Sequence, residues 1–284
     1  MMSEQAEPGG CLKVFGAHGF TQREVEEYAR LVAAKKPYVI FFTPRSGSSY
    51  LAEVLAATKQ LGQPEEFLNQ DLAPLAIKHI TETGHVTRHV IDYLSWIVTH
   101  RSSENGVFGL KLSYGCIEPL VRAGLDRVLL GAFTPITLVR KNILKQAVSL
   151  YVAVSTGLFH TNIAHSQEVY DKASTLVYDW EKIRFWVQHM AIQEAALGNY
   201  IEKNGLDCLH VDYDQVCREP GGVLERIAAR LHVPATGHVG GGETVFQKVR
   251  TKTNDALVEQ FVSDESNLRF LESLGLDESR LLGE

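Results

Sequence analysis

The stretch YVIFFTPRSGSSYL, residues 38–51, contains a hydrophobic run that stops abruptly at a proline. The run itself, residues 38–43, is continuous and rich in β-branched and aromatic side chains, which is typical of a buried parallel strand. After Pro44 come an arginine, three serines and a glycine, and an apolar pattern with helical spacing begins at Leu51. The stretch therefore predicts a strand, a loop of small polar residues and a helix.

The composition of this loop indicates a site for an oxyanion. Ligands of open α/β sheets bind beyond the carboxyl ends of the strands, where loops lead into helices. Small residues there let backbone amides approach a phosphate or sulfate, and the next helix adds the positive end of its dipole. We expect an anion to be bound by Arg45, Ser46, Gly47, Ser48 and Ser49. The alternative is an ordinary strand-to-helix turn with a serine N-cap.

Strand-like and helix-like patterns alternate along the rest of the chain. Further strands are expected at residues 107–114, 133–140 and 206–213. Helices are expected at residues 22–34, 51–61, 144–154, 167–203 and 223–231, with others starting near 117 and near the C-terminus. The alternation predicts one α/β domain, residues 21–284, in which helices flank a central parallel sheet. Residues 1–20 are expected to form a loose lead.

The composition is that of an ordinary globular protein and disfavours several classes of function. Of the 284 residues, 45% are hydrophobic and 22% are charged, and the net charge of −6 provides no overall basic field for nucleic acid. The apolar run at residues 128–139 is short and is interrupted by glycine and proline, so we expect no membrane span. The four scattered cysteines and the polar N-terminus predict a cytoplasmic protein with reduced thiols and no metal site.

A second candidate anion site follows the strand expected at residues 133–140. Arg140 ends that strand, and Ser149 lies nine residues later in the next helix. Because parallel strands share one carboxyl edge, Arg140 should lie on the same side of the sheet as the first loop. Lys141, Lys145 and Ser149 recur at every fourth position and form one polar face, so a solvated amphipathic helix is the alternative.

The first loop lacks the pattern of an ATP or GTP site. The phosphate-binding loop of nucleoside triphosphatases follows the pattern GxxxxGK[ST]. The loop here is shorter and has no lysine before its last serine, and no predicted strand ends in an evident magnesium-binding aspartate. A P-loop-type kinase is therefore the weaker interpretation.

Together and in this order, the motifs resemble those of the bacterial trehalose sulfotransferase-like family. TPRSGSSYL resembles the 5′-phosphosulfate-binding loop of sulfotransferases, and Arg140 with Ser149 resembles their 3′-phosphate-binding segment. GQPEEFL at residues 62–68, GVFGLKL at 106–112 and QAVSLYVAVSTGLF at 146–159 also match, and VDY at 211–213 matches more weakly. The resemblance covers roughly residues 38–213.

This resemblance implies an enzyme with a P-loop-like sulfotransferase fold and without a metal. Its donor would be 3′-phosphoadenosine 5′-phosphosulfate (PAPS), and its acceptor a hydroxyl of a carbohydrate, lipid or small metabolite. Arg45 and its loop would stabilise the departing 5′-phosphate oxygen, while Arg140 and Ser149 would hold the 3′-phosphate. Members of the family often form dimers, so a homodimer is one open assembly, although the sequence shows no interface.

The acceptor hydroxyl has to lose its proton, and a positioned base typically contributes about 10²–10⁴-fold to the rate. The resemblance assigns this role to the second carboxylate of a PxEF motif, which is Glu66, with Glu65 as the weaker choice. Alternatively, Pro64 begins a helix that has acidic residues in its first turn. Lys111 matches a lysine of the family and would place a second cation near the sulfuryl group, unless it is a plain strand-end lysine.

Three further features remain open at the level of sequence. The basic segment FQKVRTKTN, residues 246–254, resembles the late loop with which family members cover the 3′-phosphate, so Lys248 and Arg250 are candidates, although a solvated loop fits equally well. The tryptophans at 96, 180 and 186 could line a sugar pocket, but core packing is the preferred interpretation. A non-catalytic sulfotransferase-like protein that binds nucleotide is the main alternative function.

Overall fold

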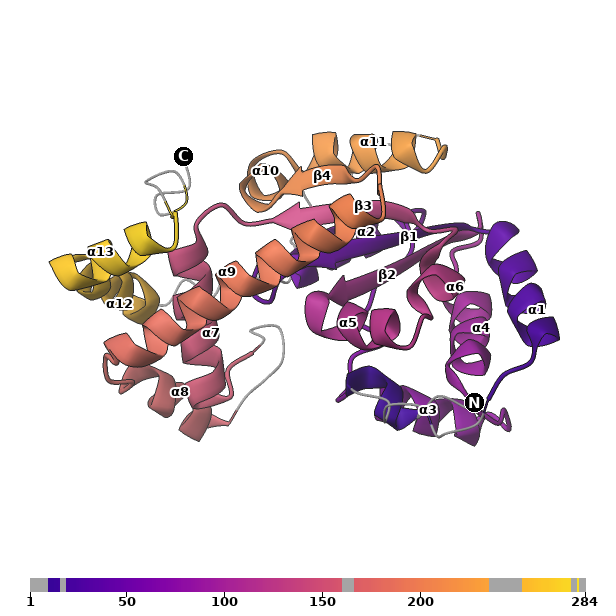
Figure 1. The fold of residues 1–284 in the computed structure, drawn as a ribbon, viewed down its shortest axis with the longest axis horizontal. Coiled ribbons are helices and arrows are strands. Elements are labelled where there is room, and N and C mark those ends of the chain that lie inside the picture. The colour runs from indigo at the N-terminus through magenta and orange to yellow at the C-terminus, as the bar shows by residue number, and fades with distance from the viewer. Residues whose placement is uncertain (1–9, 16–18, 160–165, 235–251, 277–279, 281–284) are drawn as a thin grey trace, which may run out of the picture.

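The computed structural model in Figure 1 describes residues 10–15, 19–159, 166–234, 252–276 and 280. Four strands form its central sheet: β1 (Lys36–Phe42), β2 (Val107–Ser113), β3 (Thr134–Val139) and β4 (Leu209–Asp212). Their order across the sheet is β2-β1-β3-β4, and every neighbouring pair is parallel. The predicted α/β architecture around a parallel sheet is confirmed, and each predicted strand is present.

Alternation along β1 divides the hydrophobic core into two layers. Tyr38, Ile40 and Phe42 belong to one buried cluster, whereas Val39 and Phe41 belong to another on the opposite face of the sheet. Successive side chains of a strand point to opposite faces, so a strand covered on both sides has to be apolar at every position. This burial on both faces is why the run at residues 38–43 is unbroken.

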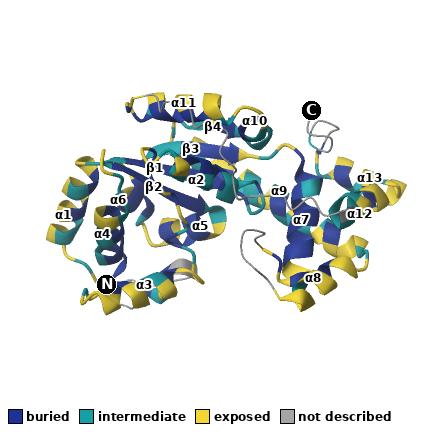
Figure 2. Ribbon diagram, turned by 180° about the vertical axis from the view of Figure 1, so that it is seen from behind, coloured by how far each residue is buried: buried dark blue, intermediate teal, exposed yellow. Residues whose placement is uncertain are grey.

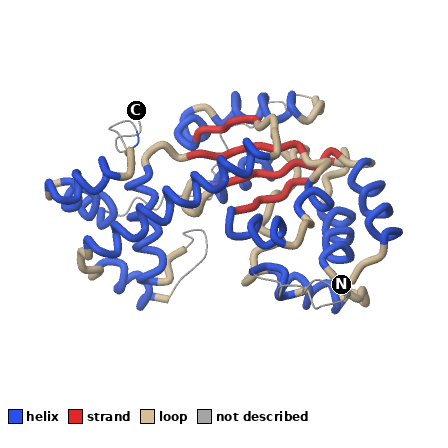
Figure 3. The backbone as a smooth tube through the Cα atoms, viewed as in Figure 1, coloured by secondary structure: helices blue, strands red, loops and turns tan. Residues whose placement is uncertain are grey.

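Helices cover both faces of the sheet (Figure 3). The face that carries Ile40 is covered by α2 (Ser48–Ala57), α10 (Tyr213–Arg218) and α11 (Pro220–Arg230). The opposite face is covered by α1 (Gln22–Ala33), α3 (Ala73–Glu82), α4 (Val90–Arg101), α5 (Tyr114–Arg122) and α6 (Asp126–Leu130). β4 lies at the edge of the sheet, and His210 within it is exposed. The carboxyl ends of the strands face the remaining helices (Figure 1).

A group of helices lies beyond the carboxyl ends of the strands (Figure 1). It consists of α7 (Ile143–Thr156), α8 (Gln167–Ser174), α9 (Trp180–Lys203), α12 (Lys252–Val262) and α13 (Glu265–Ser273). α7 is at the centre of this group and is buried along most of its length (Figure 2). The alternative of a solvated amphipathic helix at this position is therefore wrong.

The single long helix predicted at residues 167–203 is wrong, because the structure contains two helices there. α8 ends at Ser174, and α9 begins at Trp180 after the N-cap Asp179, whose carboxylate accepts a hydrogen bond from the Lys182 amide at 3.0 Å. Both helices pack against α7, and each therefore needs apolar residues on the side that faces it. The apolar spacing in the sequence runs on from one helix to the next for this reason. An apolar pattern therefore did not reveal the cap that separates the two helices.

The N-terminal segment was predicted to be a loose lead over residues 1–20. In its described part, Gly10–Val14 forms a 3₁₀ helix, and Leu12 and Phe15 are buried in the core on the α5 side of the sheet. These two side chains are packed rather than loose. Among the described helices, none combines the length and the apolar character that a membrane crossing requires.

Candidate active site

The loop between β1 and α2 has the backbone conformation of an open anion site. The N-cap of α2 is Gly47, with φ of 90°, and no side chain caps the helix. The alternative of a serine N-cap is therefore wrong. The first amides of a helix have no partner within the helix, and they attract anions together with the helix dipole. α2 thus presents an uncapped N-terminus at the carboxyl end of β1.

Tyr213 explains why glycine is needed at position 47. A Cβ added to Gly47 would lie 2.1 Å from Cδ2 of the Tyr213 ring. A positive φ also strains any residue that has a Cβ. The ring of Tyr213, at the start of α10, therefore packs directly against the backbone of the loop. The sequence assigned no role to this tyrosine beyond a weak match of VDY.

The three serines of the loop differ in their surroundings. Ser46 is fully buried, and its Oγ has no hydrogen-bond partner within the described part of the chain. Ser48 is also buried, whereas Ser49 is partly exposed. A buried hydroxyl without a partner costs about 1–3 kcal/mol. An oxyanion placed in the loop would give Ser46 the partner that it lacks.

Arg45 is held across the loop by contacts from α7 and from the segment after it. Its Nε donates to Oγ of Ser149 at 3.0 Å, and its guanidinium also donates to the carbonyl oxygen of Phe159. Burial and the nearby charge of Arg140 both lower the pKa of Arg45. No carboxylate of the described residues forms an ion pair with it. A permanent charge is therefore held in a partly buried position by neutral acceptors.

Arg140 supports the same loop from the end of β3. Its guanidinium donates to the carbonyl oxygen of Arg45 at 3.1 Å and lies over the Tyr213 ring, 5.1 Å from the ring centroid. The structure therefore brings together Arg45, Arg140 and Ser149, as the two sequence motifs led us to expect. The hydrogen bond from Arg45 to Ser149 was not expected from the sequence.

Gln146 is a residue of this site that sequence reasoning missed. Its Nε2 donates to Oγ1 of Thr43 at 2.7 Å and to the carbonyl oxygen of Pro44 at 2.6 Å. The side chain is completely buried, and its Oε1 has no hydrogen-bond partner in the part of the chain that is described. The available signal was a glutamine in a helix whose neighbouring side chains are apolar. A buried amide at such a position has to find polar partners.

A second cluster joins Glu66 to the end of β2. Nζ of Lys111 lies 3.4 Å from Oε1 of Glu66, and Nδ2 of Asn69 donates to Oε2 of Glu66 at 3.2 Å. Lys111 is only 5% exposed, which is rare for a lysine. Burial lowers the pKa of Lys111, and the Glu66 carboxylate opposes this shift. An ammonium and a carboxylate are thus fixed against each other beside the sheet.

The neighbouring Glu65 is oriented differently. Its carbonyl oxygen accepts a hydrogen bond from the Lys111 amide at 2.9 Å, so its backbone extends the edge of the sheet beyond β2. Its carboxylate forms an ion pair with Arg101 of α4. No helix begins at Pro64, which removes the alternative of acidic residues in a first helical turn. Only Glu66 of the two carboxylates pairs with the buried lysine.

The candidate cations of the late loop, Lys248 and Arg250, lie outside the described residues. Their expected contact with the 3′-phosphate stays a prediction. The core of the candidate site consequently consists of the loop at 44–49, the ends of β2 and β3, and α7.

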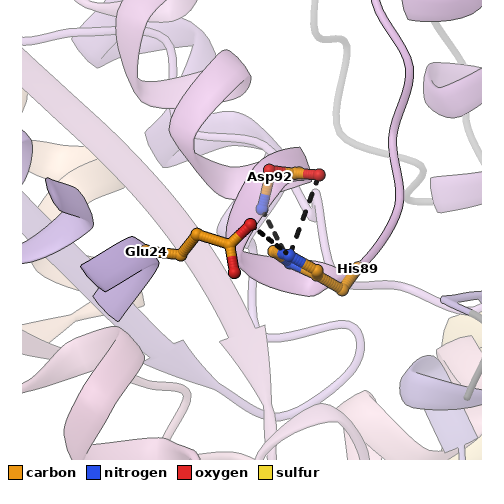
Figure 4. A group of neighbouring side chains, drawn as sticks. All are labelled: Glu24, His89 and Asp92. Carbon is orange, nitrogen blue, oxygen red and sulfur yellow. Dashed lines mark hydrogen bonds and ion pairs between the residues drawn. The ribbon is translucent and has the colours of Figure 1, made fainter. Parts of the chain in front are cut away.

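A separate cluster of ionisable groups joins α1 to α4 (Figure 4). His89 is the N-cap of α4, and its Nδ1 accepts a hydrogen bond from the Asp92 amide at 3.2 Å. Nε2 therefore carries the ring proton and faces Oε1 of Glu24 at 3.3 Å. Arg88 forms ion pairs with both carboxylates, at 2.9 Å and 2.7 Å. This cluster is a helix cap with an ion-pair network, and Nε2 in this tautomer has no lone pair for a metal.

Comparison with known proteins found a family match and a similar solved structure. Residues 37–264 match the family described as Stf0 sulphotransferase. Among solved structures, the chain is similar to the "Sulfotransferase Domain from the Synechococcus PCC 7002 Olefin Synthase", with 16% sequence identity and a TM-score of 0.42. The similarity covers 86% of this chain and 96% of that one. No curated protein matches the sequence.

Proposed function

The chain belongs to the Stf0 sulfotransferase family and is a sulfotransferase, and we propose that it transfers the sulfuryl group of PAPS to a hydroxyl of a small acceptor, with Glu66 as the general base. The choice of donor rests on one observation, the partial burial of the Arg45 guanidinium next to a second positive charge on Arg140. A partly buried guanidinium with a second arginine nearby is unfavourable unless negative charge compensates it. The phosphate groups of PAPS would supply that charge.

The loop supports the departure of the nucleotide. In the transfer, the acceptor oxygen forms a bond to sulfur while the bond from sulfur to the 5′-phosphate oxygen breaks. Negative charge then develops on that oxygen, and donors that are already in place stabilise it best. Arg45, the amides at the start of α2 and the hydroxyls of Ser46, Ser48 and Ser49 are suited to this task. Gln146 and Tyr213 would hold the loop in shape.

Glu66 and Lys111 provide the two charges needed at the acceptor. The carboxylate of Glu66 would take the proton of the acceptor hydroxyl as that oxygen attacks sulfur. Lys111 holds the carboxylate in position through their 3.4 Å contact, and its ammonium is proposed to stabilise the charge of the transferring sulfuryl group. Asn69 binds the second carboxylate oxygen, which further restricts the side chain.

The 3′-phosphate is what distinguishes PAPS from ATP. Arg140 and Ser149 are the proposed ligands of this group, with Lys248 and Arg250 as additional candidates. Oγ of Ser149 accepts from Arg45 in this structure. A hydroxyl that accepts one hydrogen bond can also donate its proton, which would be to a phosphate oxygen in this proposal. The proposal requires no metal ion. A homodimer and a cytoplasmic location also remain predictions.

Transfer from radiolabelled PAPS to a panel of sugars, aliphatic alcohols and aromatic alcohols would test this function directly. We expect a labelled sulfate ester with at least one class of acceptor, without added magnesium. We also expect 3′-phosphoadenosine 5′-phosphate (PAP) to raise Tm, whereas ATP with magnesium would not. Stabilisation by ATP–magnesium alone would favour a P-loop-type kinase. Stabilisation by PAP without transfer to any acceptor would favour a non-catalytic nucleotide-binding protein.

A further inference from the structure

A pocket of about 230 Å³ opens beside Glu66, between the segment that precedes α3 and the helices α3 and α4. Its walls include Phe67, Leu72, Ile80, Trp96 and Ile97. Glu66 also lines the pocket, so one residue belongs both to this cavity and to the ion pair with Lys111. If Glu66 is the base, a molecule in the pocket is adjacent to the group that would remove its proton.

The walls of the pocket are mainly apolar. Seven of the eleven lining residues are aliphatic or aromatic. Tyr93 is among them, but its hydroxyl already donates to the carbonyl oxygen of Phe67 at 2.9 Å. The guanidinium of Arg101 is paired with Glu65 and lies over the Phe67 ring, although its Nε has no hydrogen-bond partner among the described residues. A sugar needs many hydrogen-bond partners, and only four of the eleven lining residues, Glu65, Glu66, His79 and Arg101, carry polar or charged groups other than the paired Tyr93 hydroxyl and the Trp96 indole N–H.

The apolar residues that line the pocket differ in their exposure. Ile80 and Ile97 are 1% and 2% exposed, whereas Leu72 at the start of α3 is 49% exposed. The exposed side chain of Leu72 is therefore available to an apolar ligand that enters the pocket. At about 230 Å³ the cavity lies just below the range of about 300–1,000 Å³ that is typical of ligand pockets, which favours a small ligand.

We infer that the acceptor is a small alcohol with an apolar body, which occupies this pocket and presents its hydroxyl to Glu66. The inference rests on the proposed function, because it takes Glu66 as the base of sulfuryl transfer. It predicts preference for an alcohol such as naphthylmethanol over a polyhydroxylated sugar such as trehalose. Burial of the apolar body would supply the binding energy, and the carboxylate would fix the position of the hydroxyl.

The test uses two matched variants of the full chain, Leu72→Asn and Leu75→Asn. Both leucines are exposed residues at the start of α3, but only Leu72 lines the pocket. Binding of naphthylmethanol and of trehalose is measured by calorimetry on protein saturated with PAP, and KM is measured with PAPS. We expect Leu72→Asn to weaken naphthylmethanol binding and to raise its KM on the order of tenfold, and Leu75→Asn to change neither by more than about twofold.

The outcomes separate this inference from the function on which it rests. Tighter binding of trehalose than of naphthylmethanol, or equal effects of the two substitutions, would overturn the apolar acceptor while PAP binding stayed intact. Binding of PAP without binding of naphthylmethanol would do the same. Failure of the unaltered protein to bind PAP would instead overturn the proposed donor, and the inference with it.

Discussion

Nε of Arg45 donates a hydrogen bond to Oγ of Ser149 at 3.0 Å, although 104 residues separate them along the chain. Arg45 belongs to the loop after β1, and Ser149 lies on α7, which follows β3. The contact joins the proposed 5′-phosphosulfate loop to the proposed 3′-phosphate segment. The two motifs that the sequence presents separately therefore form one structural unit, and disturbing one should affect the other.

Substitution Ser149→Ala should weaken PAP binding on two grounds. It removes a proposed phosphate ligand, and it leaves Nε of the charged Arg45 without its acceptor. A hydrogen bond to a charged group contributes about 1.5–3 kcal/mol, which corresponds to a loss of affinity of about 10- to 100-fold. Calorimetry with PAP measures the change. Ser155→Ala, at an exposed position of the same helix, is the control, and equal affinities of the two variants would contradict the prediction.

Substitution Glu66→Gln should separate chemistry from donor binding. The amide keeps the size of the side chain but cannot accept the proton, so we expect kcat to fall by about 10²-fold or more and PAP affinity to change little. Steady-state kinetics with PAPS and an accepted alcohol provide the measurement. Glu65→Gln is the matched control, because that carboxylate pairs with Arg101 instead of Lys111. Normal turnover in Glu66→Gln would remove this residue from the mechanism.

Lys111 should set the alkaline limit of activity. Burial lowers its pKa, so the ammonium loses its proton at a lower pH than the ordinary lysine value of 10.5. If its charge is needed for transfer, kcat/KM has to fall at a correspondingly lower pH. Lys111→Arg retains the charge throughout the accessible range. We expect this variant to keep measurable activity and to lose the alkaline decrease, and pH profiles of both proteins test this. An unchanged profile would mean that another group limits activity.

Gly47→Ala should damage the site far more than a similar change elsewhere. The new Cβ meets the Tyr213 ring at 2.1 Å, and φ of 90° strains it as well. Gly84 provides the control, because its φ is 85° and nothing lies within 4 Å of an added Cβ. Gly84→Ala should lose only about 1–2 kcal/mol of stability and keep PAP affinity, whereas Gly47→Ala should lose at least tenfold in affinity. Thermal denaturation and PAP titration distinguish the two, and normal PAP binding by Gly47→Ala would be inconsistent with this account.

Substitution Gln146→Ala should destabilise the loop after β1. The substitution leaves Oγ1 of Thr43 and the carbonyl oxygen of Pro44 without their shared donor in a buried setting. Loss of one partner of a buried hydrogen bond costs about 1–3 kcal/mol, so both the free energy of unfolding and PAP affinity should fall. The exposed Gln188 of α9 is the matched control. A stable variant with unaltered PAP binding would show that Gln146 does not position the loop.

Much of the fold could be predicted because short sequence patterns indicate where strands and helices form. A strand buried on both faces must be apolar at successive positions, as β1 is, and an amphipathic helix such as α1 repeats its apolar residues every three or four positions. The break between α8 and α9 escaped this reasoning because apolar spacing persists across it. α9 begins at the side-chain cap of Asp179, and the spacing of apolar residues contains no information about a polar cap.

The sequence by itself determined the chemistry of the site: small hydroxyl residues and an arginine after one strand, an arginine at the end of another, and a pair of carboxylates before a third. Residue type and position along a strand are local properties, so they can be read from the chain. Tertiary structure alone decided that Arg45 reaches Ser149, that Tyr213 packs on Gly47, and that Glu66 rather than Glu65 faces Lys111. Each of these contacts joins segments far apart in sequence, and their geometry depends on how the strands and helices pack.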